Sequence, residues 1–373
     1  MYKFGVFFKK ATAFLLLCAA FLISVAAEQP SLSAASAILI RADNGECIAA
    51  YNADEQRGMA STTKIMTALV AIENGDLDQK ITIPNEALGV EGSSLYLKKG
   101  EEMSLRELLY GLMLQSANDA AEAIAILVGG SVEGFAEMMN QKAAELGLAN
   151  THFTNPHGLA EDDHYTTARD LAHISAYALK NETFREICST RKTTIPAAEG
   201  VRWLINHNKM LTIYDGTYGV KTGFTKATGR CLVSAAEREG VQLIAVTLNA
   251  PNDWDDHRAL LDYGFSQLEC VQLAKQDDFV CELPLIGGEC GSVALHIRND
   301  VTAVLPKDRD SIVERMELLQ PRFAPIYKGD EVGRIVYTLA GKEIASSPLY
   351  AATYVGKRQT DTSFLEKLTN IFR

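Results

Sequence analysis

Ser61 and Lys64, three residues apart in the stretch MASTTKIMTALV, could form a nucleophile and its base. The apolar residues that follow predict a helix, and its 3.6-residue repeat places both side chains on nearly the same face. A helix-capping serine and a solvated lysine would show the same spacing. The strongly apolar stretch 65–72 favours burial of Lys64, so the choice between these interpretations depends on the rest of the chain.

Two further short motifs occur later in the chain. Ser116-Ala117-Asn118 lies between two predicted helices, and Lys221-Thr222-Gly223 lies on a predicted strand. Each motif is common by itself. The ordered set S-x-x-K, S-x-N and K-T-G resembles the set of class A β-lactamases and penicillin-binding proteins, which carry S-D-N as the middle member. The order therefore indicates acyl-transfer chemistry.

The residue types suit that chemistry. A serine hydroxyl needs a neighbouring base to accept its proton as it attacks a carbonyl. Lys64 can act as this base only when neutral, and burial together with the charge of Lys221 would lower its pKa. Ser116 can relay a proton towards the leaving nitrogen. Asn118 can hold either the substrate amide or the lysine.

The third motif suits a peptide that ends in a carboxylate. Gly223 lets a peptide backbone approach the strand closely. Lys221 and Thr222 offer a cation and a hydroxyl donor to the carboxylate. The developing oxyanion would lie between the backbone N–H groups of Ser61 and Phe224. The residues alone thus predict acyl transfer on a peptide with a free C-terminal carboxylate.

Longer stretches between residues 36 and 265 resemble the low-molecular-mass penicillin-binding proteins that are serine D-alanyl-D-alanine carboxypeptidases. These stretches are ASTTKIMTAL, LLYGLMLQSANDAAEAIA, HFTNPHGL, HYTTARDLA, GVKTGFTKATGRCLVSAA and LLDYGF. The resemblance implies a Ser61 acyl-enzyme that removes the terminal D-alanine of peptidoglycan stem pentapeptides and is acylated by β-lactams. It implies no cofactor and no metal. The implied catalytic residues are Ser61, Lys64 and Ser116, and the implied substrate-binding residues are Asn118, Lys221, Thr222, Gly223, Phe224 and Thr225.

One position departs from the resemblance. Some relatives carry a carboxylate-binding arginine before the LL-x-aromatic-GF segment, and the matching position here is Asp253. Lys221, Thr222 and Thr225 would then bind more of the carboxylate, or Arg258 would reach the site.

Three alternative functions remain on the same fold. A β-lactamase would need a glutamate that activates water, and the loop 151–167 offers Glu161, Asp162 and Asp163. A D,D-endopeptidase would differ only in its leaving group. A non-catalytic scaffold that binds the cell wall would keep the fold without the reaction. The NPHGL context of His157 favours a carboxypeptidase over a β-lactamase, and we assign that histidine to loop packing.

Composition predicts an exported, acidic protein. The chain has 373 residues, 47% of them apolar, and a formal net charge of −11. Residues 1–27 contain three lysines and a short apolar run that ends in small residues, which indicates a cleaved signal peptide; a membrane anchor is the alternative. Cleavage would lower the charge to −14 because it removes three lysines and no acid. Such a charge disfavours nucleic acid as a partner. No C-x-x-C or H-E-x-x-H spacing indicates a metal or redox site, and cysteine pairing stays open.

The elements that must position these motifs predict an α/β fold. A hairpin over 36–56 precedes the Ser61 helix, residues 105–148 are helical with a break at 129–130, another helix covers 166–179, and strands return from Thr217. The first and last strands can share one sheet. The resemblance implies a penicillin-binding/β-lactamase-like transpeptidase domain, with an antiparallel sheet flanked by helices and a helical subdomain. We expect a signal peptide at 1–27, a catalytic domain at 32–268, an all-β domain at 275–352 and an amphipathic helix at 361–373.

The C-terminal helix is expected to attach the protein peripherally to the outer face of the cytoplasmic membrane. Its apolar side chains form one stripe, and its charges balance, so attachment should be weak. The alternative is that this helix docks back onto the protein.

Overall fold

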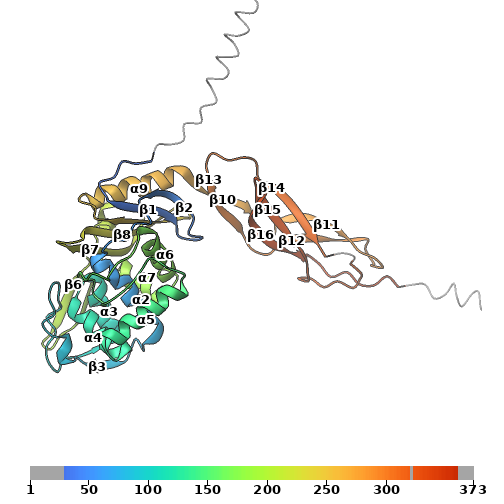
Figure 1. The fold of residues 1–373 in the computed structure, drawn as a ribbon. Helices are drawn as coiled ribbons and strands as arrows, with labels where there is room; N and C mark the ends of the chain where they lie inside the picture. Colours follow the sequence, from blue (N-terminus) through green and yellow to red (C-terminus); the bar gives the residue numbers. More distant parts are fainter. Residues whose placement is uncertain (1–28, 320–321, 360–373) are drawn as a thin grey trace, which may run out of the picture.

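The fold combines an α/β domain with a smaller β domain that extends away from it (Figure 1). It is described from a computed structural model, which covers residues 29–319 and 322–359. The predicted signal peptide and the predicted C-terminal helix lie outside these residues. Within them, no helix is both long enough and apolar enough to cross a membrane.

The α/β domain is built on a five-stranded antiparallel sheet with the order β2-β1-β9-β8-β7. Ile38 of β1 pairs with Val246 of β9, so the first strands of the domain join its last strand as predicted. β7, which carries the K-T-G motif, is the edge strand beside the helices. The strands are β1 (Ser36–Arg41), β2 (Cys47–Tyr51), β7 (Thr217–Thr225), β8 (Gly229–Arg238) and β9 (Val241–Leu248).

Helices cover both faces of this sheet. α9 (Asp253–Gln267) packs on one face, over β8 and β9, as the ribbon shows (Figure 1). The larger core lies between the other face and a layer of helices that includes the apolar helix after Ser61. These helices are α2 (Lys64–Asn74), α3 (Leu105–Leu114), α4 (Asn118–Gly129), α5 (Val132–Glu145), α6 (Ala168–Ala178) and α7 (Glu182–Ser189). The predicted helical segments are therefore confirmed, and the break at 129–130 separates α4 from α5.

The sequence patterns did not predict two small hairpins at the rim of the helical layer. One pairs β3 (Lys80–Thr82) with β4 (Glu102–Ser104), and the other pairs β5 (Lys192–Pro196) with β6 (Val201–Ile205). Both are short, and the second exposes apolar side chains on one side, so it lacks a clean alternation of buried apolar and exposed polar residues. The remaining short helices are η1 (Ala60–Thr63), η2 (Asn85–Ala87) and α8 (Met210–Ile213).

The C-terminal part is all-β, as predicted, with its own apolar core. Its main sheet has the order β11-β12-β16-β15-β14, and a separate ladder pairs β10 with β13. β10 directly follows α9, so it joins the two parts of the chain. The strands are β10 (Leu268–Ala274), β11 (Phe279–Pro284), β12 (Ser292–Ile297), β13 (Val301–Pro306), β14 (Val313–Leu318), β15 (Glu331–Leu339) and β16 (Lys342–Ala351).

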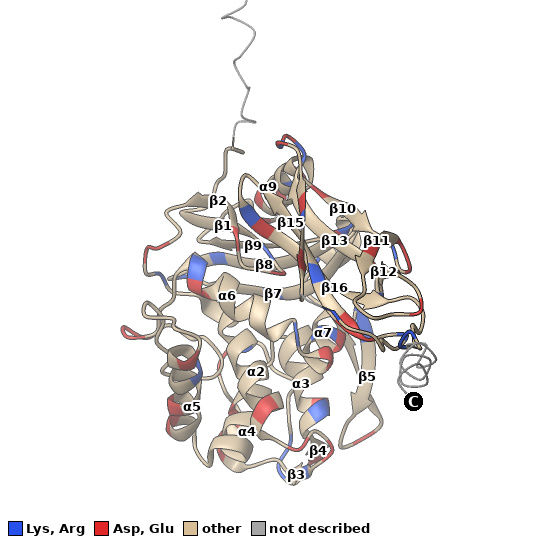
Figure 2. Ribbon diagram, turned by 90° about the vertical axis from the view of Figure 1, so that its right-hand side faces the viewer, with Lys and Arg blue, Asp and Glu red and all other residues tan. Residues whose placement is uncertain are grey.

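Charged residues of both signs are interspersed along the helices and strands in the view of Figure 2. Among the described residues, all six cysteines are free thiols, and no group of three or more His, Cys, Asp or Glu side chains is placed to hold a metal ion.

Candidate active site

Ser61 and Lys64 meet at the start of the apolar helix α2. Ser61 lies in the 3-10 turn η1, and Lys64 is the first residue of α2. Their side chains are 3.0 Å apart, measured from Lys64 Nζ to Ser61 Oγ. Ala60, just before the serine, has a positive φ of 47°, a conformation that non-glycine residues rarely adopt and that often occurs at functional sites. The turn therefore presents the serine hydroxyl directly to the lysine amine.

Lys64 is fully buried and has two further oxygen neighbours. Its Nζ lies 2.7 Å from Asn118 Oδ1 and 2.6 Å from the carbonyl oxygen of His157. A neutral amine has two N–H bonds and one lone pair. If the N–H groups donate to the amide and the carbonyl, the lone pair is left facing Ser61 Oγ. This arrangement is the one that a base for the serine proton requires.

The surroundings of Lys64 favour the neutral amine. Burial is the largest cause that lowers the pKa of Lys64 well below its ordinary value, and the charge of Lys221 lowers it further. The carboxylate of Asp119 acts in the opposite direction. Burial also lowers the pKa of Lys221, to about 7. Burial thus disfavours protonation of both amines, and the charge of Lys221 adds to this effect at Lys64.

Asn118 holds the lysine in the structure. Its Oδ1 accepts from Lys64, and its Nδ2 donates to the backbone carbonyl of Glu91 at 2.5 Å. Both ends of the amide are therefore occupied by the protein. Of the two roles that the sequence left open for Asn118, the structure shows contact with the lysine.

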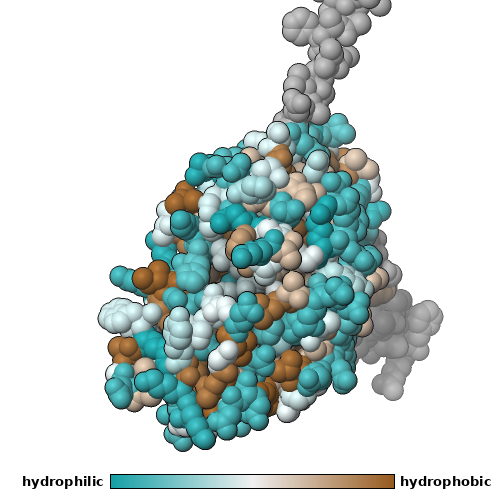
Figure 3. All heavy atoms as spheres, turned by 60° about the vertical axis from the view of Figure 1, so that its left-hand side comes forward, coloured by the Kyte–Doolittle hydropathy of each residue, from teal (hydrophilic) through white to brown (hydrophobic). Residues whose placement is uncertain are grey.

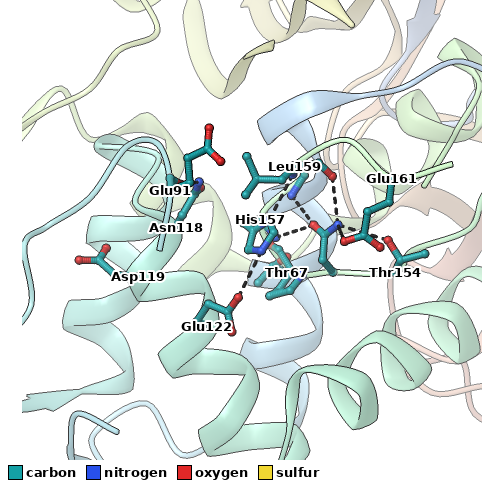
Figure 4. Close-up of polar contacts among 12 residues, drawn as sticks. Thr67, Glu91, Asn118, Asp119, Glu122, Thr154, His157, Leu159 and Glu161 are labelled. Atoms are coloured by element: carbon teal, nitrogen blue, oxygen red, sulfur yellow. Dashed lines mark hydrogen bonds and ion pairs between the residues drawn. The ribbon is translucent and has the colours of Figure 1, made fainter. Parts of the chain in front are cut away.

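The loop after Phe153 supplies the carbonyl that accepts the hydrogen bond from Lys64. Figure 4 shows the contacts that fix this loop. The His157 ring accepts at Nδ1 from the N–H of Leu159 at 3.1 Å, so its proton lies on Nε2, which is 3.3 Å from Glu122 Oε1. Thr67 of α2 donates to the carbonyl of Pro156 at 2.6 Å. The His157 ring packs in the loop as predicted, but sequence reasoning missed the contribution of its carbonyl because a backbone oxygen has no residue signature.

Gly158 lets this loop pass close to the serine turn. Its φ is +86°, and a Cβ added there would lie 1.9 Å from the carbonyl oxygen of Ala60 and 2.7 Å from Thr63 Oγ1. We expect Gly158→Ala to lower the melting temperature and to slow acylation strongly, because the turn that carries Ser61 must move. Gly147→Ala is the matched control, since Gly147 also has a positive φ, +74°, but nothing lies within 4 Å of its added Cβ.

In the control, alanine introduces only the strain of a left-handed backbone, so the variant should lose about 1–2 kcal/mol of stability and keep its acylation rate. Thermal unfolding and acylation rates of both variants check this expectation. Equal behaviour of the two variants would show that the contact between loop and turn does not matter.

The K-T-G motif lies along the serine turn on edge strand β7. A Cβ on Gly223 would lie 3.0 Å from the backbone nitrogens of both Ser61 and Thr62, so this glycine lets the strand approach the turn itself. Lys221 is buried and donates to the carbonyl of Thr222 at 2.8 Å. Thr222 is half-buried and faces the open cavity. The three motifs are therefore brought together around Ser61.

A cavity of about 620 Å³ opens over Ser61. Ser116, in the break between α3 and α4, lines this cavity and has a positive φ of 60°. Among the described residues, its hydroxyl has no hydrogen bond to either Lys64 or Lys221. Thr225, the last residue of β7, is not among the lining residues, and its Oγ1 lies 2.9 Å from Thr228 Oγ1. The lining residues are Ser61, Ser93, Ser116, His207, Lys209, Thr222, Gly223, Phe224, Arg230, Pro251, Asn252, Asp253, Trp254 and Asp255.

Arg230 is a lining residue that sequence reasoning missed. It forms an ion pair with Asp253, with 2.9 Å between Nη2 and Oδ2. Arg258, which the sequence offered for the substrate carboxylate, is not among the residues that line the cavity and lies 3.6 Å from Asp255 instead. The signal for Arg230 was present in GVKTGFTKATGRCLVSAA, because a tight turn between two strands brings residues 224 and 230 opposite each other.

Glu161, one of the three carboxylates considered for a β-lactamase, lines a separate cavity with Met59 and Ala60. Its Oε1 accepts from Asn155 Nδ2 at 3.1 Å, as Figure 4 shows. Its position therefore differs from the one that a water-activating residue beside Ser61 would need.

Several large apolar side chains are exposed in the α/β domain, and one of them, Phe224, lines the cavity. Figure 3 brings forward the side of the molecule on which β6 and β7 lie, and it shows apolar patches on the lower half of that face. Exposed large side chains in this part of the chain are Tyr96, Val201, Trp203, Ile205 and Phe224.

Comparison with known proteins gives consistent matches over both parts of the chain. The family described as D-alanyl-D-alanine carboxypeptidase matches residues 23–252, and the C-terminal domain of penicillin-binding protein 5 matches residues 268–357. D-alanyl-D-alanine carboxypeptidase DacF of Bacillus subtilis is 34% identical, with 85% of each chain covered. DacA of Escherichia coli K12 is 34% identical over 86% of this chain and 83% of its own. The crystal structure of penicillin-binding protein 5 from Haemophilus influenzae is similar with a TM-score of 0.65 and 30% identity, covering 88% of this chain and 99% of that one.

Proposed function

The chain belongs to the D-alanyl-D-alanine carboxypeptidase family of serine hydrolases, and on this premise we propose that Ser61 is the nucleophile that releases D-alanine from peptidoglycan stem peptides. The observation that carries the assignment is the 3.0 Å contact between Ser61 Oγ and the fully buried amine of Lys64. Release of free D-alanine from a pentapeptide stem is the test. The family also explains why β-lactams should acylate the same serine.

Acylation follows from the positions of these groups. Neutral Lys64 takes the proton of Ser61 as Oγ attacks the carbonyl carbon of the D-Ala-D-Ala bond. The carbonyl oxygen becomes an oxyanion that the backbone N–H groups of Ser61 and Phe224 stabilise. Because β7 is an edge strand, its free edge can bind the extended peptide beside the serine.

Collapse of the tetrahedral intermediate breaks the peptide bond. The leaving nitrogen takes a proton from the Lys64 ammonium, directly or through the hydroxyl of Ser116, and D-alanine departs as a free amino acid. Water then attacks the ester on Ser61 and loses a proton to neutral Lys64, and the Lys64 ammonium returns this proton to Ser61 Oγ as the ester bond breaks and the shortened peptide leaves. The serine and the amine return to their starting states, so no cofactor is consumed.

The polypeptide is proposed to act outside the cytoplasm, where members of the family act on peptidoglycan. Residues 1–27 are assigned as a cleaved signal peptide because of their lysines and apolar run. The proposed bounds are 32–268 for the catalytic domain and 275–352 for the β domain. Residues 361–373 are assigned as a helix that attaches the protein peripherally to the membrane.

Truncation after Gln359 should release the protein from membranes. The mature full-length protein should float with liposomes, because the tail presents Phe364, Leu365, Leu368, Ile371 and Phe372 on one helical face. Flotation should persist at high salt, since two basic and two acidic side chains of the tail balance. Leu368→Asp is the length-matched control and should weaken flotation. Equal flotation of the full-length and truncated proteins would contradict attachment through this tail.

A further inference from the structure

A buried histidine contacts the serine turn from the side of the loop before α6. His164 is 4% exposed, and its Nε2 lies 2.8 Å from Oγ1 of Thr63, two residues after the proposed nucleophile. Thr63 Oγ1 also lies 2.8 Å from the carbonyl oxygen of Ala60. Two successive hydrogen bonds, which we call the His164–Thr63 link, therefore connect a distant loop to the peptide bond that precedes Ser61.

The neighbours of the ring fix the direction of each hydrogen bond. The backbone N–H of Thr154 can only donate, and its nitrogen lies 3.1 Å from Nδ1 of His164. The neutral ring therefore carries its proton on Nε2 and donates it to Thr63 Oγ1, and the threonine hydroxyl donates in turn to the carbonyl of Ala60. Burial is the largest cause that lowers the pKa of His164, to about 4, so the ring is neutral at neutral pH.

The link fixes the peptide bond between Ala60 and Ser61. In a planar trans peptide the C=O and N–H groups point in opposite directions. A hydrogen bond that holds the Ala60 carbonyl towards Thr63 therefore holds the Ser61 N–H towards the other side. The Ser61 nitrogen lies beside edge strand β7, since a Cβ added to Gly223 would be 3.0 Å from it. The orientation of this N–H thus depends on where the Ala60 carbonyl is held.

Packing alone does not hold this side of the turn. A cavity of about 480 Å³ borders it, and Met59, Ala60 and His164 are among the lining residues. Ala60 also has a positive φ of 47°, a strained conformation that the surrounding contacts must maintain. The ring of His164 is itself fixed, because it packs edge-on against Phe153 with 5.8 Å between ring centres. A fixed ring and a strained peptide bond are therefore joined by the hydroxyl of Thr63.

We propose that His164 is a positioning residue for the oxyanion hole. Through Thr63 it sets the orientation of the Ala60–Ser61 peptide bond, and so directs the N–H of Ser61 towards the oxygen of the reacting carbonyl. The inference rests on the proposed function, in which this N–H stabilises the oxyanion. His164 is not among the residues that line the cavity over Ser61, so it acts through the turn and not through contact with the substrate.

The test uses the purified mature protein and two substrates that differ in one atom. One is an acyl-D-Ala-D-lactate ester, and the other is its thionoester, in which sulfur replaces the oxygen that becomes the oxyanion. Sulfur accepts hydrogen bonds weakly, so an intact oxyanion hole favours the ester. His164→Ala should lower kcat/KM for the ester by about ten- to a hundredfold, less than the cost of removing a whole oxyanion-hole donor, and for the thionoester by less than about threefold. An equal loss on both substrates, or no loss, would overturn the proposal.

Two conservative variants separate the hydrogen bond from the packing of the ring. The amide nitrogen of glutamine can reach the position of Nε2, so His164→Gln should recover most of the ester rate. The amide of asparagine reaches only the position of Nδ1, so His164→Asn should behave like His164→Ala. The opposite order of these two variants would refute the role of the link. Thr63→Val removes the hydroxyl of the link, so it should lower the ester-to-thionoester ratio of kcat/KM and add little to His164→Ala when the two changes are combined.

His257→Ala controls for a general loss of stability. His257 is also fully buried, and its Nε2 lies 3.0 Å from a threonine hydroxyl, that of Thr247, but it does not line the cavity over Ser61. Its replacement should lower the melting temperature and leave the ester-to-thionoester ratio unchanged. A ratio that falls as far in this variant as in His164→Ala would overturn the proposal.

Failure of this inference is distinguishable from failure of the proposed function. If the wild type cleaves neither ester and releases no D-alanine from a stem pentapeptide, the proposed function fails and the inference fails with it. Release of D-alanine by the wild type, together with an unchanged ester-to-thionoester ratio in His164→Ala, refutes only the role of His164.

Discussion

Replacement of Lys64 by arginine should slow acylation of Ser61 by about a hundredfold to ten-thousandfold, the usual contribution of a positioned acid-base group. Arginine cannot lose its proton at any pH where the protein is folded, so it would carry a permanent positive charge at a place where the active enzyme needs a neutral base. The amine of Lys64 is fully buried and 3.0 Å from Ser61 Oγ, so no water replaces it as base without rearrangement. Stopped-flow acylation by a β-lactam measures the loss.

Lys142→Arg is the matched control for this change. Lys142 forms ion pairs with Glu73 and Glu145, and it lies on α5 away from the cavity. Its replacement should leave both the acylation rate and the melting temperature nearly unchanged. A Lys64→Arg enzyme within about threefold of the wild type would mean that another group takes the serine proton.

The pH dependence of acylation gives the same assignment a second readout. Because the neutral amine is the base, the rate should rise as pH rises through the lowered pKa of Lys64 and then level off. Lys221→Ala removes a positive charge that lowers this pKa, so the rising limb should move to higher pH. A limb that moves to lower pH, or stays in place, would contradict electrostatic coupling between the two lysines.

Much of the arrangement around Ser61 could be predicted from local sequence. Ser61 lies just before the apolar helix α2, Ser116 lies in the break between α3 and α4, and Gly223 lies on the edge strand β7. Each of these elements has a clear periodic pattern in the sequence. These patterns indicated that the first strands and β9 share a sheet, and the pairing of Ile38 with Val246 confirms it. Burial of Lys64 also followed from the apolar residues after it, and its side chain is 0% exposed.

Other features depend on contacts that sequence spacing does not encode. The carbonyl of His157 reaches Lys64 because Gly158 and Ala60 touch across two distant segments. Gly223 was expected to let the substrate backbone approach β7, and the structure shows that this glycine lets the turn that carries Ser61 lie close to β7. The exposed apolar side of the β5–β6 hairpin obscured its strand pattern, since Trp203 is 73% exposed.

Ser61→Ala should abolish covalent labelling by β-lactams and lower peptide cleavage by about 10⁴-fold or more, because it removes the hydroxyl that forms the ester. The strained ring of a β-lactam presents a carbonyl and a nearby carboxylate, as a D-Ala-D-Ala terminus does. Intact-protein mass spectrometry should show one adduct on the wild type and none on the variant. Ser266→Ala, an exposed serine whose hydroxyl donates to the carbonyl of Tyr263, should label like the wild type.

An adduct that survives on Ser61→Ala would place the nucleophile elsewhere. Loss of the adduct together with a lowered melting temperature would instead indicate damage to η1, so thermal unfolding of the variant accompanies the mass measurement. Alanine removes only the hydroxyl, so we expect the thermal unfolding transitions of the variant and the wild type to agree closely.

The most direct test of the central claim is to incubate the purified mature protein with a peptidoglycan stem pentapeptide and to measure free D-alanine against time. The wild type should release one D-alanine per peptide and leave a tetrapeptide, while Ser61→Ala and Lys64→Arg should release almost none. A wild-type protein that is folded and labelled by β-lactam but leaves the pentapeptide intact would contradict the assignment as a carboxypeptidase.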